Sequence, residues 1–507
     1  MQFRDNMHCI LIRQLSRSFL VFQLIYNLSK MKKIIYLVAL SFVLNSCNDD
    51  DITFTPYNSV SEGIVLRTAS DFENMITGAY SYMIKNGGAN GYGSEFVIDS
   101  EVMTDNLILM VEGRNTNANS FRLINVPSSS SFDYYESAYR AAETATRALD
   151  QINNLPKDAQ RDNIEGQALF IRALNNFDLV RIYSKIPTQS SDANSSLGMP
   201  YLDKVDPFAK PSRGTVAESY AKIVTDLERA KALIATANQN TAGKANRAAV
   251  CALLSRVYLY MGDYAKVIEN GNLALAGNAV CPRASFVGLW DDVNSSGVLF
   301  KLRIDQVDGV TPGVVFSQTV TAGIRSEYVA QKNVADLFSA TDIRKAAYFR
   351  TSAYNGNVYN HIIKYDGRLT GNPAIVDIKV IRIEEVLLNM AEAQYRINGG
   401  GLAFLDQVRA QRYAPFVSGA ETGVALFNAI MLERRLELAF EMDRFFTLKR
   451  LGLPMVRNAV EGDFANGLGT KVEASALTIP AGSTKWQLPI PQSQIDLNKN
   501  LIQNPGY

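Results

Sequence analysis

Residues 251–275 read CALLSRVYLYMGDYAKVIENGNLAL, which is two helical segments joined by a short turn. Large and small residues recur in them at a fixed spacing, on Leu254, Ser255, Tyr258, the turn Gly262-Asp263-Tyr264, and Ala274. Small residues let two helices approach closely, and the Tyr fills the gap between one helical pair and the next. Val267 stands where Ala is usual in such a pair. The stretch therefore predicts a helical pair that is slightly wider than consensus.

Helical periodicity recurs on both sides of this pair. The expected helices cover residues 70–82, 133–153, 161–184, 215–236, 244–261, 263–276, 379–397, 401–412 and 422–450. Pairs of helices joined by short turns are typical of an α-solenoid, and the spacing in 251–275 is that of a tetratricopeptide repeat. We therefore predict a mainly α fold, in which a tetratricopeptide-like helical-pair scaffold carries a loop-rich irregular subdomain.

The loop-rich subdomain is expected in residues 281–378. There Val, Ile, Tyr and Thr occur in short runs between Gly, Asn and Ser clusters, which indicates irregular loops with short strands. Two other segments are predicted as loops: residues 86–94, which are rich in Gly and Asn, and residues 186–214, which are rich in Ser, Pro, Gly and Asp. The tail, 451–507, is expected to be irregular. The helical scaffold then occupies 67–280 and 379–450.

The start of the chain has the features of an export signal. Residues 31–46 read MKKIIYLVALSFVLNS: two lysines precede an eleven-residue apolar run that is too short to span a bilayer. Leu44 lies three residues before Cys47, with the small Ser46 between them, and this pattern resembles the bacterial lipobox. The resemblance implies that Cys47 is lipidated and that the residues before it are removed. Residues 1–30 are interpreted as an over-called start; a genuine extension remains the alternative.

The residues after Cys47 favour a tether. Asp49, Asp50 and Asp51 follow directly, which suits a solvated linker better than a helix that continues into a core. A buried Cys at the end of a core helix is the alternative interpretation. We expect residues 47–66 to join a lipid-anchored Cys to the folded domain.

Composition and charge argue against a nucleic-acid partner. The 507 residues are 47% hydrophobic and 20% charged, as in a globular protein. Residues 1–46 hold six Lys/Arg and one acidic residue, which leaves 45 basic and 49 acidic residues in the rest, a net charge of −4. A mildly acidic chain without a basic block makes nucleic acid an unsuitable partner.

Few residues have the chemistry for catalysis or metal binding. The four cysteines show no CxxC spacing, and His361 is the one histidine after the predicted cleavage site. We therefore expect no enzyme activity and no cofactor. Glu433, Glu437 and Glu441 recur on one helix face, as a glycosidase pair could. We interpret them as part of a structural ion network whose cations are Arg409, Arg412, Arg434, Arg435 and Arg444. No metal site is assigned, and a calcium ion held by Asp/Asn loops remains open.

Together with the lipobox, four blocks resemble the SusD/RagB family of outer-membrane nutrient-binding lipoproteins. In family order they are EGQALFIRALNNFDLVRIYSKIP (165–187), VIRIEEVLLNMAEAQYRINGG with LDQVRAQR (380–412), ERRLELAFEMDRFFTLKRLG (433–452) and WQLPIPQSQIDLNKNLIQNPGY (486–507). Two positions depart from the family pattern: Met442 replaces a usual Gly, and Thr447 replaces a common acidic residue. The resemblance implies one binding domain over 67–507.

The family resemblance also implies a function. Its members act as lids over a SusC-like TonB-dependent β-barrel, capture an oligomeric nutrient and pass it on. The ligand is most often a glycan, which is the leading hypothesis here. A peptide or protein ligand, as in RagB-like members, and a purely structural repeat adaptor are the alternatives, with a surface glycosidase as the enzymatic rival. In Bacteroidetes, acidic residues directly after the lipidated Cys accompany export to the outer face of the outer membrane.

Ligand-binding residues are predicted in the loop after the first helix and in the loop-rich subdomain, where the family places them. Aromatic rings stack on sugars, while amide, carboxylate and guanidinium groups form hydrogen bonds with hydroxyls. The candidates are Asn90, Tyr92, Asp105, Asn106, Arg114, Asn115, Arg325, Tyr328, Tyr354 and Tyr359. The two tryptophans, Trp290 and Trp486, are interpreted as structural, which leaves open a Tyr platform or a less aromatic ligand, such as a branched host glycan or a peptide.

Overall fold

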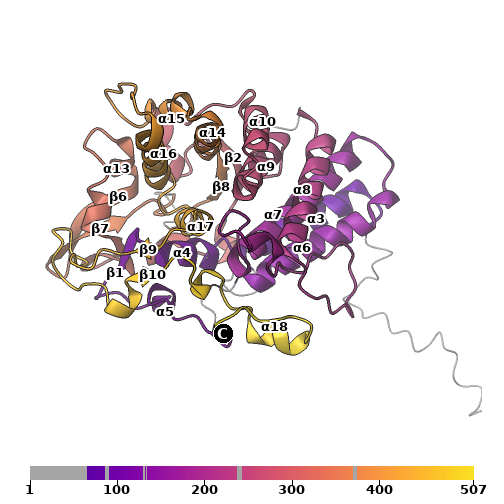
Figure 1. Cartoon of the computed structure of the whole chain (residues 1–507), viewed down its shortest axis with the longest axis horizontal. Helices are drawn as coiled ribbons and strands as arrows, with labels where there is room; N and C mark the ends of the chain where they lie inside the picture. The colour runs from indigo at the N-terminus through magenta and orange to yellow at the C-terminus, as the bar shows by residue number, and fades with distance from the viewer. Residues whose placement is uncertain (1–65, 86–90, 130–131, 133, 237–241, 369–373) are drawn as a thin grey trace, which may run out of the picture. The chain divides into compact units, whose positions relative to one another are not determined.

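A stack of helices forms the scaffold in the computed structural model, which describes residues 66–85, 91–129, 132, 134–236, 242–368 and 374–507. Each helix packs on the next, from α3 to α6, α7, α8, α9, α10, α14 and α16. Figure 1 shows the stack from α3, α6, α7 and α8 on the right to α14, α15 and α16 on the upper left. The bounds are α3 Ala69–Ile84, α6 Tyr135–Asp150, α7 Ala159–Tyr183, α8 Val216–Leu233, α9 Arg247–Met261, α10 Tyr264–Leu275, α14 Ile383–Asn398, α15 Leu402–Arg409 and α16 Gly423–Glu437.

Local signals start and stop these helices. Thr68 and Thr215 form capping boxes with Asp71 and Glu218, which satisfy orphan backbone donors at the first turns of α3 and α8. Gly262 ends α9 in the left-handed region with φ of 79°, and α10 begins two residues later. The predicted helical pair is confirmed, and so is the mainly α fold class.

The predicted single helix over 422–450 is wrong. α16 ends at Glu437 and α17 (Arg444–Arg450) begins after a turn in which Phe440 and Met442 have φ of 66° and 63°. The turn carries Glu441 onto Arg382 and Lys364, which no continuous helix would allow. The left-handed backbone at Met442 explains why Gly is usual there.

Two further elements differ from the predictions because they are buried all round. Residues 378–382 form strand β8 (Ile378–Arg382), which pairs with β2 (Val298–Leu302), and α14 begins only after it. Helix α4 (Glu95–Val102) is not among the helices expected from the sequence. A fully buried strand or helix shows neither alternation nor an amphipathic face, so periodicity cannot identify it.

The loop-rich subdomain contains a six-stranded antiparallel sheet, and so is more regular than predicted. Its order is β1-β5-β7-β6-β4-β3, with β1 from the segment that precedes α6. The strands are β1 Leu107–Leu109, β3 Gln318–Val320, β4 Gly323–Arg325, β5 Tyr328–Ala330, β6 Phe349–Tyr354 and β7 Asn357–Ile362. Figure 1 shows β1, β6 and β7 at the left. Pairing of β1 with β5 brings the loop after β1 to the sheet.

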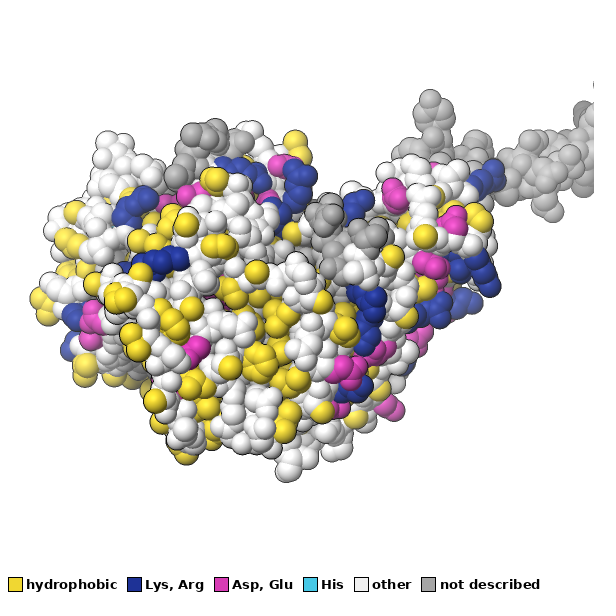
Figure 2. Space-filling view, turned by 90° about the horizontal axis from the view of Figure 1, so that it is seen from above, with side chains coloured by type: hydrophobic (Ala, Val, Ile, Leu, Met, Phe, Trp, Pro, Cys, Tyr) yellow, Lys and Arg dark blue, Asp and Glu magenta, His cyan; other side chains and the backbone are white. Residues whose placement is uncertain are grey.

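Several short helices and strands lie between and after these elements. They are α5 Ala118–Phe121, α11 Phe286–Trp290, α12 Lys332–Ala335, α13 Ile343–Tyr348, β9 Met455–Val456, β10 Thr478–Ile479 and α18 Gln492–Leu497. In these residues no helix combines the length and apolar character needed to cross a membrane. On the face in Figure 2, Lys and Arg lie interspersed with Asp and Glu, and hydrophobic side chains occupy much of the centre.

Candidate functional site

Strand register gathers polar side chains on one face of the six-stranded sheet. Gln318 lies opposite Arg325, Ser352 opposite Tyr359, and Tyr354 opposite Asn357. Gly323 lies opposite Tyr354, and since residues two apart on a strand share a face, Arg325 and Ser352 share this one. We call this surface the sheet face, and define it by Gln318, Arg325, Ser352, Tyr354, Asn357 and Tyr359. Three of the predicted ligand-binding residues, Arg325, Tyr354 and Tyr359, therefore lie together.

The sheet face adjoins a groove of about 410 Å³. We call it the β3 groove, and its lining comprises Val314, Ser317, Gln318, Thr319, Arg350, Asp366 and Ala374. Its volume lies within the range of about 300–1,000 Å³ that is usual for small-molecule sites. Burial raises the pKa of Asp366, whose Oδ1 has no hydrogen-bond partner among the described residues.

Donors on the sheet face lack partners. Arg325 donates from Nη2 to Gln318 Oε1 at 2.7 Å, but its buried Nε has no partner among the described residues. The hydroxyl of Ser352 is likewise buried without a partner there. An unpaired buried polar atom costs about 1–3 kcal/mol, so each of these atoms would gain from a hydrogen bond to a polar group that a small shift of the neighbouring side chains admitted.

The loop after β1 closes the other end of the sheet face. Glu112 accepts hydrogen bonds from Asn355 Nδ2 at 2.8 Å, Asn357 Nδ2 at 3.4 Å and the Tyr359 hydroxyl at 3.4 Å. Gly113 is required here, because a Cβ would lie 2.9 Å from the carbonyl oxygen of Ser326. Burial, and then the Glu112 carboxylate, raise the pKa of Tyr359.

Three more predicted residues lie beside this loop. The half-exposed Arg114 pairs through Nε with the buried Glu327 at 2.5 Å, and Asn115 is exposed with φ of 61°. Tyr328 is buried and donates its hydroxyl to Thr116 O at 2.7 Å. The structure thus brings Arg114 and Asn115 close to the sheet face. The register puts Tyr328 on the opposite face, because its neighbour Val329 lies opposite His361, which shares a face with Tyr359.

The remaining described candidates lie away from the sheet face. The Tyr92 side chain is buried and donates to Asp178 Oδ2 at 2.5 Å. Asp105 pairs with Arg444 and Arg435, and Asn106 is buried against Glu101. A ligand would reach Tyr92 and Asn106 only if this packing opened. Asn90 and Cys47 lie outside the described residues.

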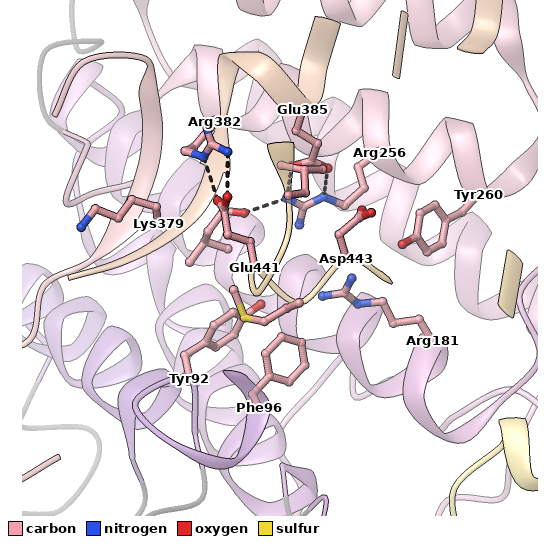
Figure 3. A pocket seen from close by; sticks show the side chains of 13 residues that line it. Tyr92, Phe96, Arg181, Arg256, Tyr260, Lys379, Arg382, Glu385, Glu441 and Asp443 are labelled. Atoms are coloured by element: carbon pink, nitrogen blue, oxygen red, sulfur yellow. Dashed lines mark hydrogen bonds and ion pairs between the residues drawn. The ribbon is translucent and has the colours of Figure 1, made fainter. Parts of the chain in front are cut away.

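Tyr92 lines a small polar cavity, shown in Figure 3, of about 20 Å³. Arg382 reaches Glu441, and Arg256 reaches Glu385, across its walls. The space suits about one water molecule with several polar partners, and is too small for a sugar. The cavity is lined by members of a buried network of ion pairs, among them Arg382 and Glu441.

The predicted structural ion network is confirmed for the three glutamates. Glu433 pairs with Arg344 and Arg409, Glu437 with Arg344, Arg382 and Arg412, and Glu441 with Lys364 and Arg382. Of the predicted cations, Arg409 and Arg412 hold the glutamates, but Arg434 pairs with Asp443, and Arg435 and Arg444 pair with Asp105. Arg344, Arg382 and Lys364, from outside the predicted set, supply the other cations. Burial lowers the pKa of Lys364 to about 8, although Glu441 opposes this shift. Every glutamate of the trio is held by cations.

The buried Glu101 beside this network makes stability depend on pH. Burial raises the pKa of its carboxyl to about 8, against about 4.3 in an unfolded chain. As pH rises between these values the unfolded chain ionises while the folded chain stays protonated, so stability falls by about 1.4 kcal/mol per pH unit. Glu101→Gln should remove this decline. Urea unfolding at pH 5 and pH 8 checks it. Glu143→Gln, which changes a carboxylate on the surface of α6, should keep the wild-type decline of the free energy of unfolding with pH. An unchanged decline in Glu101→Gln would contradict the assignment to Glu101.

His361 has a nearby serine but not the arrangement of a nucleophilic pair. Nδ1 lies 2.8 Å from Ser326 Oγ, and that hydroxyl donates to Phe316 O at 2.6 Å. The hydroxyl proton is therefore directed away from the imidazole, which as Nδ1–H would be the donor. Burial lowers the pKa of His361 to about 4, so the ring is neutral near pH 7.

The described residues contain no group of three or more His, Cys, Asp or Glu that could hold a metal ion. Cys251 and Cys281 are free and buried. A second groove, of about 510 Å³, lies between Pro127–Ser129, the start of α6, and α18. We call it the α18 groove. It contains none of the predicted ligand-binding residues.

Comparison with known proteins gives two family matches. A family described as "Starch-binding associating with outer membrane" matches residues 57–259, and one described as "SusD family" matches residues 256–507. The two matches together span the chain from 57 to its end.

Individual relatives agree with these matches. SusD-like protein P2 of Formosa agariphila is 27% identical over 536 residues, which cover 94% of this chain and all of that protein. A putative sugar binding protein from Bacteroides vulgatus has a TM-score of 0.76 at 26% identity, covering 87% of this chain and 99% of its own. A SusD-like carbohydrate binding protein from the same species has a TM-score of 0.76 at 21% identity and 86% and 97% coverage, and shares the fold.

Proposed function

This chain belongs to the SusD family, and from that premise we propose that it is a cell-surface lipoprotein that captures an oligosaccharide and delivers it to a SusC-like TonB-dependent transporter. It acts by binding, without turnover. The family is associated with the outer membrane and with carbohydrate binding. Cys47 provides the lipid anchor, and the acidic residues after it favour the outer face.

The observation that carries the glycan proposal is the set of unpaired polar atoms on the sheet face beside the β3 groove. Arg325 Nε and Ser352 Oγ are buried and have no partner among the described residues, and Asp366 Oδ1 offers an unpaired acceptor in the groove. Sugars present many hydroxyls that both donate and accept, so a ligand of this class satisfies all of these groups.

Hydrogen bonding is the expected mode of recognition rather than stacking. Tyr354 is 8% exposed and Tyr359 is fully buried, so neither ring offers a face for a sugar. Tyr359 instead packs its ring against Phe464, with centroids 5.4 Å apart. A Tyr platform, which the sequence left open, is therefore not the mode of binding that we propose.

A peptide ligand is the second candidate. β3 is an edge strand of the sheet and borders the β3 groove. An extended peptide could add to such an edge through main-chain hydrogen bonds. The lid role over a transporter would be the same.

A structural adaptor without ligand is the third candidate. Deleting the predicted binding loop, residues 86–115, would not distinguish it from a binding protein. That segment includes α4, whose residues 96–102 are buried, so its loss would unfold the domain. Point substitutions in the groove separate binding from folding.

Gln318→Ala tests the site. Loss of this side chain removes a hydrogen-bonding group that a sugar in the groove would use, and also the acceptor that holds Arg325 in position. Affinity for the glycan should therefore fall about threefold to tenfold. Affinity electrophoresis against a glycan panel measures the change. Gln492→Ala is the matched control, because Gln492 lines the α18 groove. The site is misplaced if the control weakens binding and Gln318→Ala does not.

A further inference from the structure

Two arginines lie on the side of the sheet that carries the sheet face: Arg325, which belongs to it, and Arg350, two residues before Ser352 on β6. Arg325 makes its one side-chain hydrogen bond to the uncharged Gln318, and no carboxylate among the described residues forms an ion pair with it. Arg350 is 47% exposed at the side chain and lies 3.5 Å from Asp366 Oδ2. Asp291 also interacts electrostatically with Arg350, so Arg350 has two carboxylates nearby, and Arg325 is the arginine of the two without an ion pair among the described residues.

Strand geometry places the two side chains within reach of one ligand. Because Gly323 pairs with Tyr354, the register puts Arg325 opposite Ser352, and Arg350 is two residues along the same strand. Diagonal neighbours of this kind have Cα atoms about 7–8 Å apart, and arginine is long enough to close that gap. Arg350 lines the β3 groove, and Arg325 is bonded to Gln318, which also lines it.

Guanidinium groups are suited to anions. They donate parallel hydrogen bonds to carboxylate or sulfate oxygens, and such charge-assisted bonds are about twice as strong as neutral ones. A neutral sugar would use the donors but leave Arg325 without a counter-charge in a partly buried site. Glu112, at the other end of the sheet face, is already engaged by Asn355, Asn357 and Tyr359.

We propose, resting on the function proposed above, that the captured oligosaccharide is acidic, and that Arg325 and Arg350 bind its carboxylate or sulfate group in the β3 groove. Ser317, Gln318 and Ser352 then bond the hydroxyls of the same sugar. The neutral donors set the position of the chain, and the two arginines select for charge.

The test uses a glycan array that holds neutral oligosaccharides beside uronate-containing and sulfated ones, followed by calorimetry on the tightest ligand and its methyl-esterified or desulfated counterpart. We expect the acidic ligand to bind more tightly than its neutral counterpart by about tenfold or more. Arg325→Gln and Arg350→Gln should each remove about tenfold of affinity for the acidic ligand and leave the neutral counterpart nearly unchanged. Raising the salt concentration should weaken the acidic ligand more.

Arg140→Gln is the matched control, since Arg140 is a half-exposed arginine on α6 that pairs with Glu136. It should bind like the wild type. Tight binding of neutral glycans alone would overturn the acidic ligand while leaving glycan capture intact, as would acidic binding that is indifferent to both arginine substitutions. Binding of peptides and of no glycan would overturn the proposed function itself.

Discussion

Replacing Glu437 with Ala should lower the free energy of unfolding by about 3–5 kcal/mol, because it leaves buried guanidiniums without their shared counter-charge. Glu437 lies 2.8 Å from Arg412, 2.9 Å from Arg382 and 3.2 Å from Arg344, and all four side chains are at most 1% exposed. Urea unfolding of the purified chain measures the loss. Glu136→Ala, which breaks a half-exposed pair with Arg140, should cost about 0–1 kcal/mol.

The same substitution should change the response to acid. Burial alone would raise the pKa of Glu437, but Arg412, Arg382 and Arg344 hold it well below its usual range. A carboxylate of this kind stabilises the fold above its unfolded pKa of about 4.3, and the stabilisation is lost as pH falls. Glu437→Ala should therefore lose less stability than wild type on acidification. A loss near that of Glu136→Ala at neutral pH would show that the network does not hold the fold.

Replacing Cys47 with Ala should release the protein from the membrane into the soluble fraction. Each buried acyl CH₂ contributes about 0.8 kcal/mol, so removing the lipidation site removes the durable anchor. Fractionation and detergent phase partitioning measure the change. A protein that stays bound as tightly as wild type would contradict the anchoring by Cys47.

The sequence predicted the helical scaffold because its helical pairs have a recognisable residue spacing and local stop signals. Residues 251–275 show a small-residue spacing and a Gly at the turn, and both survive in α9 and α10. The break after Glu437 has no such signal. It depends on Arg382 and Lys364, which lie far from Glu441 in the sequence, and no local pattern reports a partner of that kind.

The candidate site was predictable in part. Tyr354 and Arg325 could be selected by residue type, but only the strand register shows that they share a face. Ser352, Gln318 and Arg350 carry no signal in the sequence that separates them from other polar residues. Tyr92 lies in a segment with the composition of a binding loop, yet its hydroxyl donates a hydrogen bond to Asp178 in the protein interior. Burial of an aromatic residue in a Gly-rich loop depends on tertiary packing.

Calorimetric titration of the purified chain with a glycan panel and a peptide panel decides whether this chain captures an oligosaccharide. We expect saturable binding of at least one oligosaccharide, weakened by Gln318→Ala and unchanged by Gln492→Ala, and no binding of peptides. Clear peptide binding with no binding of any glycan would contradict it.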